Sequence, residues 1–186
     1  HGILNVRGTE SSPVIMKAKA KEKWAGLHIL TDHDQKERVQ FINNLLVKNV
    51  ERASSDVCVS IVNSTFVING LIIDGCAAED ALNIVYSNVK ITDLEIRATE
   101  SDGLDTDYSN LYLTRAKFTK IGGDALDFSG SNILIKNIGI YEVGDKAISV
   151  GELTKGTISG ASISKSVYGI VVKDGSIIQA NKVRSS

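Results

Sequence analysis

The sequence predicts an all-β chain wound into a parallel solenoid, with three short strands in each coil of 22 residues. Five segments align without gaps at intervals of 22 residues, and they begin at Asp80, Asp102, Asp124, Lys146 and Tyr168. Apolar and polar residues alternate three times in each repeat, which is typical of strands that bury one face. The chain also has 16 glycines but one proline, as a tightly wound coil with small bends requires.

Inward columns from all three strands of the coil should form the core. The first strand of each coil supplies Leu82, Leu104, Leu126, Ile148 and Ile170, followed two residues later by Ile84, Thr106, Phe128, Val150 and Val172. The second strand supplies Val89, Leu111 and Ile133, and the third supplies Ile96, Phe118 and Ile140. Because helical spacing is absent from the repeat, leucine-rich repeats are not predicted, and each strand should pair with its copy in the next coil.

Earlier coils are less regular. Residues 57–61 join the repeat with a one-residue adjustment, and residues 25–29 resemble an earlier turn that carries a polar insert at 31–38. The chain is therefore expected to form about seven to eight coils in one domain, residues 1–186. Neither residues 2–6 nor residues 176–186 resemble a capping helix, so we expect the domain to be a fragment of a longer protein.

Asparagines mark one bend of the coil. Asn88, Asn110 and Asn132 each follow a serine and recur at the repeat interval. Asparagine tolerates a left-handed backbone, and stacked amides can bond to one another along the axis. We expect this ladder to be structural.

Composition narrows the possible partners. With 21 Lys and Arg against 22 Asp and Glu, the net charge of −1 excludes a broad electrostatic grip on nucleic acid or on an acidic membrane. No apolar stretch approaches the roughly 18 residues that a membrane span needs. Cys58 and Cys76 match no metal or redox spacing; buried thiols are favoured over a disulfide, but the pairing and the redox compartment stay open.

Strand parity places three aspartates on one outward face. If Leu104 and Thr106 point inward, Asp105 and Asp107 point outward, and Asp127 follows one coil later. Adjacent strands lie roughly 4.8 Å apart, so these carboxylates must hold a proton, bind a cation such as Ca²⁺, or be neutralised by a lysine. They are the candidate catalytic and metal-binding residues. Aspartates that only keep the stacked sheet and its edges soluble would show the same pattern.

Further residues extend this face. Lys146 and Lys173 are the lysines in reach, and Lys146 is also a candidate catalytic group. The candidate binding residues beside the patch are Tyr86, Tyr108, Glu152, Lys173 and Asp174. Asp80, Asp102 and Asp124 open strands after a bend, where aspartate bonds nearby backbone N–H groups, so we expect them to be structural.

The period, the asparagine ladder and the aliphatic columns resemble the right-handed parallel β-helix of the pectate-lyase-like superfamily. More narrowly, residues 78–85, 121–131, 144–152 and 168–174 resemble β-helix repeats of bacterial surface proteins, some of which also carry a spore-coat-protein-H-like kinase domain. The resemblance covers nearly the whole chain and implies the fold. It implies no role for the β-helix segment itself.

Enzymes of that superfamily bind polysaccharide on an outward sheet face, which gives templates to test. Polygalacturonase-like hydrolases follow their aspartates with a His-Gly pair, but residues 146–151 contain no histidine. Related epimerases carry Asp-Pro-His-Asp, which the lone Pro13 excludes. The acidic residues that a Ca²⁺-dependent lyase needs are present in this sequence, and Lys146 or Lys173 could serve as its base.

The expected function is therefore a secreted or cell-surface module that is structural or binds carbohydrate weakly. The alternative is a Ca²⁺-dependent polysaccharide lyase or a glycoside hydrolase that acts on an acidic polysaccharide at Asp105, Asp107 and Asp127. A third possibility is an architectural rod that stacks end to end. No cofactor is expected apart from possible Ca²⁺.

Overall fold

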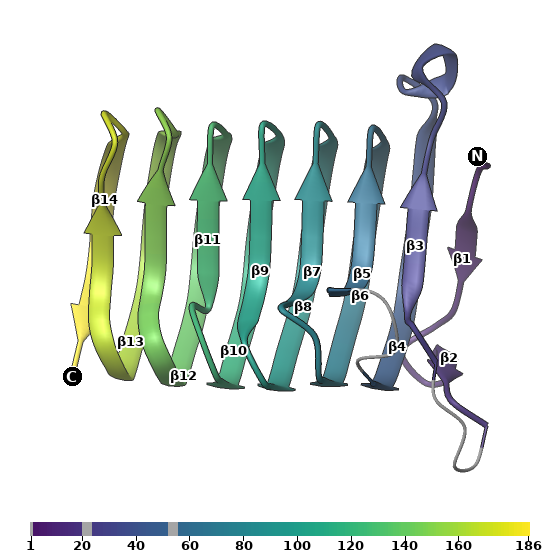
Figure 1. Ribbon diagram of the computed structural model, residues 1–186, viewed down its shortest axis with the longest axis horizontal. Coiled ribbons are helices and arrows are strands. Elements are labelled where there is room, and N and C mark those ends of the chain that lie inside the picture. The colour runs from purple at the N-terminus through teal and green to yellow at the C-terminus, as the bar shows by residue number, and fades with distance from the viewer. Residues whose placement is uncertain (1, 20–23, 52–55) are drawn as a thin grey trace.

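The computed structural model describes residues 2–19, 24–51 and 56–186, which form a parallel β-solenoid of about six turns (Figure 1). The front side of the coil is built by β3 (Leu27–Leu30), β5 (Val57–Val62), β7 (Asp80–Val85), β9 (Asp102–Asp107) and β11 (Leu126–Ser129), and by the ends of β12 (Asn132–Gly151) and β13 (Lys155–Val172). Long strands build the other two sides: β4 (Val39–Val50), β6 (Thr65–Cys76), β8 (Asn88–Thr99), β10 (Asn110–Ile121), the first parts of β12 and β13, and β14 (Ile177–Ser185).

Two short strands, β1 (Asn5–Arg7) and β2 (Val14–Lys17), pair with β4, and a 3₁₀ turn spans His33–Gln35. All pairings between the named strands are parallel, which confirms the predicted fold class. The expected seven to eight coils are too many. Among the described residues, the front side has seven strand segments, which span about six turns, and β1 and β2 pair with β4 without adding a segment to that side.

Left-handed residues divide the long strands into straight segments. Asp93 in β8 has φ 60°, and Arg115 in β10 and Asn137 in β12 have φ 54°. The register passes over them, since Thr114 pairs with Thr92 and Ala116 with Leu94. Each long strand therefore supplies a second and a third side, as the three-strand coil requires.

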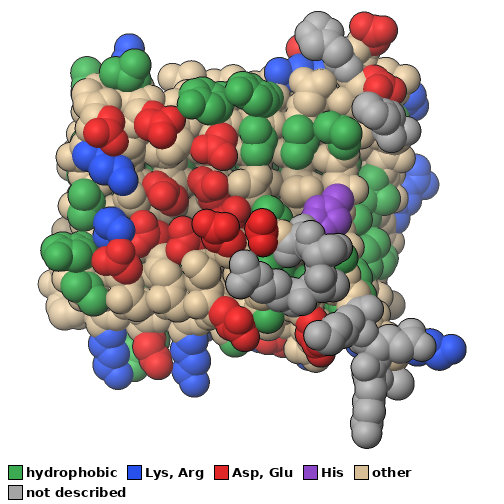
Figure 2. Space-filling view, viewed as in Figure 1, with side chains coloured by type: hydrophobic (Ala, Val, Ile, Leu, Met, Phe, Trp, Pro, Cys, Tyr) green, Lys and Arg blue, Asp and Glu red, His purple; other side chains and the backbone are tan. Residues whose placement is uncertain are grey.

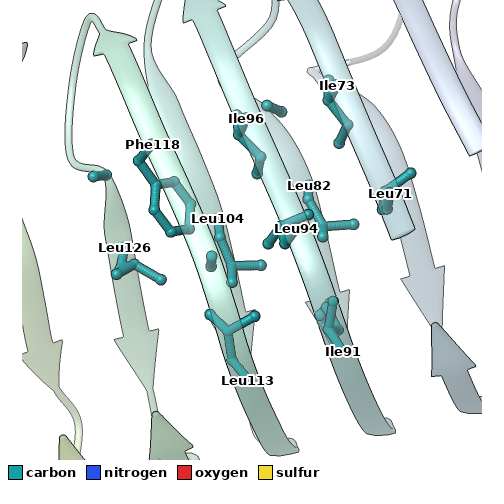
Figure 3. Packing of buried hydrophobic residues seen from close by; sticks show 14 of the residues in the cluster. Leu71, Ile73, Leu82, Ile91, Leu94, Ile96, Leu104, Leu113, Phe118 and Leu126 are labelled. Carbon is teal, nitrogen blue, oxygen red and sulfur yellow. The ribbon is translucent and has the colours of Figure 1, made fainter. Parts of the chain in front are cut away.

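The predicted inward columns form the core, except in the last coil, where Val172 is 47% exposed and the prediction is wrong. Leu82, Leu104 and Leu126 pair in register and are fully buried. Figure 3 shows Leu104, Leu113 and Phe118, which come from the three sides of one coil, converging in the interior. Burial of these columns fixes the parity of every strand, and so it decides which side chains the front side presents outward.

The asparagine ladder is present, with one correction. Asn110 Nδ2 donates to Asn88 Oδ1 at 2.6 Å, and Asn132 Nδ2 donates to Asn110 Oδ1 at 3.0 Å. The asparagines begin the next straight segment, and they are not among the residues with positive φ. The left-handed residues of this bend lie two positions earlier, at Tyr86, Tyr108 and Gly130.

A buried hydroxyl ladder lies inside the same bend. The backbone N–H groups of Ser64, Ser87 and Ser109 donate to the hydroxyl of the serine in the following coil at 2.9–3.0 Å. Ser131 donates in the same way to Thr154 Oγ1 at 3.1 Å. Each serine hydroxyl also donates to the carbonyl two residues before it; Ser109, for example, bonds Asp107 O at 2.7 Å. The ladder satisfies backbone groups that the bend removes from the strand pairing.

Cys58 and Cys76 form a disulfide, so the expectation of buried thiols is wrong. Their Cα atoms are 6.1 Å apart although the residues are 18 positions apart in the chain. Cys58 lies in β5 and Cys76 ends β6, and one coil brings its own start and end together. This closure cannot be seen from cysteine spacing alone.

Candidate functional site

The front side carries a group of aspartates that we call the acidic face: Asp80, Asp102, Asp105, Asp107, Asp124 and Asp127. Figure 2 shows acidic side chains gathered in a band over the front strands. The parity argument holds, because Leu104 and Thr106 are fully buried while Asp105 and Asp107 are partly exposed. Asp105 pairs in register with Asp127.

Asp105 is the central member of one row. Its neighbours in register are Asn83 on one side and Asp127 on the other, with Ser149 one coil further. Asn83 Nδ2 donates to Asp105 Oδ2 at 2.9 Å and to Asp80 Oδ2 at 3.3 Å. Burial, reinforced by the charges of the surrounding aspartates, raises the pKa of Asp105 to about 8.

The pKa values of Asp80, Asp102 and Asp107 shift in the same direction. Burial and the nearby charge of Asp102 raise the pKa of Asp80 to about 7. Burial is also the main cause that raises the pKa of Asp102 and of Asp107. Asp80 and Asp105 therefore hold a proton for part or most of the time near neutral pH, and a protonated carboxyl group can donate as well as accept a hydrogen bond.

The aspartates that open the strands form a ladder between coils. Asp102 Oδ1 accepts from the backbone N–H of Asp124 at 2.8 Å, and Asp124 Oδ1 accepts from that of Lys146 at 2.8 Å. The expected backbone bonds are confirmed, although they reach the next coil rather than the same bend. The sequence predicted only a structural role for these aspartates, but they also belong to the acidic face.

Lys146 ends this ladder. Its Nζ lies 3.2 Å from both carboxylate oxygens of Asp124 and 2.6 Å from Asp145 Oδ2. Bonding to Asp145, and then to Asp124, raises the pKa of Lys146. Its charge is therefore directed at the edge of the acidic face and not at Asp105.

Three carboxylates come close enough to share a cation. Oxygens of Asp102, Asp124 and Asp127 all lie within 4.8 Å of one another. Hard oxygen donors suit Ca²⁺, which takes six to eight such ligands. The hydroxyl of Ser149, in register with Asp127, is fully buried and has no hydrogen-bond partner within the part of the chain that the structure describes. The donor chemistry fits Ca²⁺, but the carboxylate of Asp124 already forms an ion pair with Lys146.

Tyr86 and Tyr108 stack beside the acidic face, as their shared repeat position predicts. Their ring centroids are 5.4 Å apart with an interplanar angle of 14°, and the residues are 54% and 52% exposed. Tyr108 lies over Gly130, where a Cβ would be 2.5 Å from its ring, and its hydroxyl donates to Glu152 Oε2 at 3.0 Å. Glu152 thus joins the site through Tyr108.

The preceding coil leaves one ring face open. Asn63 occupies the position before Tyr86 in this bend column, and its side chain donates to Thr31 O at 3.1 Å, away from the tyrosine. Tyr86 therefore presents an uncovered aromatic face at the border of the acidic face.

Lys173 and Asp174 lie further along the coil. Both are exposed, and both approach Gly151, where a Cβ would lie 3.1 Å from Lys173 Cε and 3.2 Å from Asp174 Oδ2. They border the row beyond Ser149 and do not contact Asp105 through any hydrogen bond or ion pair among the described residues. The sequence signal for the wider site is the spacing of three between Asp80 and Asn83, repeated as aspartate pairs in the next two coils.

No protein-family model, curated protein or solved structure matches this chain. The fold is a parallel β-solenoid, and the narrower resemblance to bacterial surface proteins stays an expectation. Within the described ranges, no helix has the length and apolar character to cross a membrane.

Proposed function

We propose that this chain is a secreted or cell-surface β-solenoid module that binds a glycan weakly across the acidic face. The observation that supports it most is the row of half-buried carboxyl groups beside the open ring face of Tyr86. Carboxyl groups at intervals of roughly 4.8 Å offer repeated hydrogen-bond partners to sugar hydroxyl groups. An aromatic face supplies the apolar contact that a pyranose ring needs.

The charge of the face favours a particular class of glycan. An acidic polysaccharide would add negative charge to a surface that already holds protons to limit its own repulsion. A neutral glycan, or one that carries amino groups, would lower that repulsion. We therefore propose a neutral or amino-bearing glycan as the ligand.

A binding role is favoured over catalysis by the shape of the face. The larger grooves of the described chain lie on the other two sides of the coil, lined in one case by Leu46 and Ile72 and in the other by Val67 and Tyr112. A flat sheet does not exclude water from a reacting bond, whereas it can hold an extended chain. The disulfide supports the proposed secreted or surface location, because such bonds persist in oxidising compartments.

A glycan array with and without Ca²⁺ tests the proposal. We expect the full chain to bind neutral or amino-bearing glycans, and Tyr86→Ala and Asp105→Asn to weaken that binding severalfold. Tyr141→Ala is the matched control, because Tyr141 is also exposed but lies on the third side. Equal binding by the wild type and the Tyr86 variant would contradict the proposal.

The alternative is a Ca²⁺-dependent lyase or a hydrolase that acts on an acidic polysaccharide at Asp105, Asp107 and Asp127. The close approach of Asp102, Asp124 and Asp127 favours it. Calorimetric titration with Ca²⁺ separates the two, since an absence of heat, together with unchanged melting in EDTA, removes the metal-dependent enzyme. End-to-end self-association is likewise a prediction, and sedimentation over a range of concentrations measures it.

A further inference from the structure

The second side of the coil carries a groove of about 660 Å³ that runs across β6, β8, β10, β12 and β13. We call it the lysine groove. Its lining includes Val39, Val67, Lys90, Tyr112, Leu134 and Lys155, with Lys136 beside them. Because the groove crosses the strands, it follows the axis of the solenoid.

The charge of the lysine groove is opposite to that of the acidic face. Lys90 and Lys155 line it and Lys136 lies beside it, while no Asp or Glu lines it. Nor does any of the three lysines form an ion pair with a described carboxylate. Three cations without counterions in one groove attract a polyanion.

Tyr112 holds two of these lysines in place. Lys90 Nζ lies 5.6 Å from the centre of its ring, and Lys136 Nζ lies 5.7 Å from it. Lys90 comes from the coil before Tyr112 and Lys136 from the coil after it, so the ring lies between the two ammonium groups. Contacts of this kind restrict the side chains before a ligand arrives, which lowers the entropy cost of binding.

The rest of the groove suits an extended sugar chain. Val67 and Leu134 are partly exposed and give apolar contact on either side of the lysines. The ladder of Asn88, Asn110 and Asn132 forms one rim, and its amides repeat once per coil. A polymer along the axis therefore meets the same polar group at each step of roughly 4.8 Å.

We propose that the lysine groove binds an anionic polysaccharide, with carboxylate or sulfate groups, that lies along the solenoid axis. The ring of Tyr112 disfavours single-stranded nucleic acid, because two lysine ammonium groups already lie over it and compete with a base for stacking. This proposal is independent of glycan binding at the acidic face, since it concerns another side of the coil and a ligand of opposite charge.

The test compares four polymers against the full chain: polygalacturonate, dextran sulfate, unmodified dextran and single-stranded DNA. We expect both anionic polysaccharides to bind at low salt, more weakly in high salt, and unmodified dextran not to bind in the groove. Each exposed ion pair contributes about two- to fivefold in affinity, so the double variant Lys90→Gln with Lys136→Gln should bind about tenfold more weakly.

Lys165→Gln is the matched control. Lys165 Nζ also lies over a tyrosine, at 4.8 Å from the ring centre of Tyr141, but outside the groove. The variant Lys165→Gln should therefore bind the anionic polysaccharides as tightly as the wild type. Circular dichroism melting checks that the variants fold. Unchanged polyanion binding by the folded double variant overturns the proposal, as does binding of DNA as tight as that of the polysaccharides. Asp105→Asn should leave polyanion binding at least as tight as before, which separates this test from that of the acidic face.

Discussion

Replacing Asp105 with asparagine should stabilise the protein at pH 9 and change its stability little at pH 5. The carboxyl group has its pKa raised to about 8, mainly by burial and then by the charges of Asp107, Asp80 and Asp127. In the unfolded chain its pKa is near 3.8. The folded state therefore binds this proton more tightly, and the group destabilises the fold progressively as the pH rises from about 4 to about 8. Asparagine carries no charge and can still accept the bond from Asn83 Nδ2.

The magnitude follows from the size of the shift. One pKa unit corresponds to about 1.4 kcal/mol, so an isolated, fully buried group with this shift would cost about 6 kcal/mol when ionised. Asp105 is only partly buried, and its neighbours adjust their own protonation when it ionises. We therefore expect a gain of about 2 kcal/mol at pH 9, discounted for solvent screening. For a chain of this length the melting temperature should rise by about 4 to 8 °C.

Thermal melting followed by circular dichroism at pH 5, 7 and 9 measures this gain. Asp93→Asn is the matched control, because its exposed carboxylate bonds Arg115 at 2.7 and 2.8 Å, and this contact lowers the pKa of Asp93. That variant should lose at most about 1 kcal/mol at neutral pH. A loss of stability in Asp105→Asn at pH 9, or a gain as large at pH 5 as at pH 9, would refute the electrostatic reasoning.

Three further variants test the structural features around the site. Gly130→Ala should cost about 1–2 kcal/mol in denaturant unfolding, because residue 130 has φ 59° and a Cβ would meet the tyrosine ring above it. Replacing Cys58 and Cys76 together with serine should lower the free energy of unfolding by about 3 kcal/mol, and a reductant should reproduce this loss in the wild type. Ser109→Ala should cost about 1–3 kcal/mol, because the buried N–H of Ser87 loses its acceptor; a stability equal to the wild type would show that water replaces the hydroxyl.

Much of the fold can be predicted from the repeat. The interval of 22 residues fixes which side chains stack, and the pairing of Leu104 with Leu126 and of Asp105 with Asp127 follows from it. Parity then predicts which residues face outward, because one face of each strand must be buried. The outward positions of Asp105, Asp107 and Asp127 were therefore predictable.

Other features depend on how far each side chain reaches. The bond from Lys146 Nζ to Asp124, rather than to Asp105, depends on rotamers that a periodic pattern does not encode. Tyr108 lies over Gly130 and bonds Glu152, two coils away, and this contact could not be predicted for the same reason. Closure of the disulfide depends on the shape of one coil, which brings Cys58 in β5 and Cys76 at the end of β6 together.

The row that contains Asp105 shows that the fold itself does not require carboxylates there. Asn83 and Ser149 occupy equivalent positions in the neighbouring coils, and both are accommodated within regular parallel pairing. A neutral side chain would thus be accepted at Asp105, where the carboxyl group destabilises the folded state when it ionises. A residue that reduces stability without serving the packing is consistent with a binding role, and this supports the proposed glycan contact at the acidic face. A variant at Asp105 that is more stable than the wild type but binds glycan more weakly would show that this carboxyl group lowers stability and supports binding.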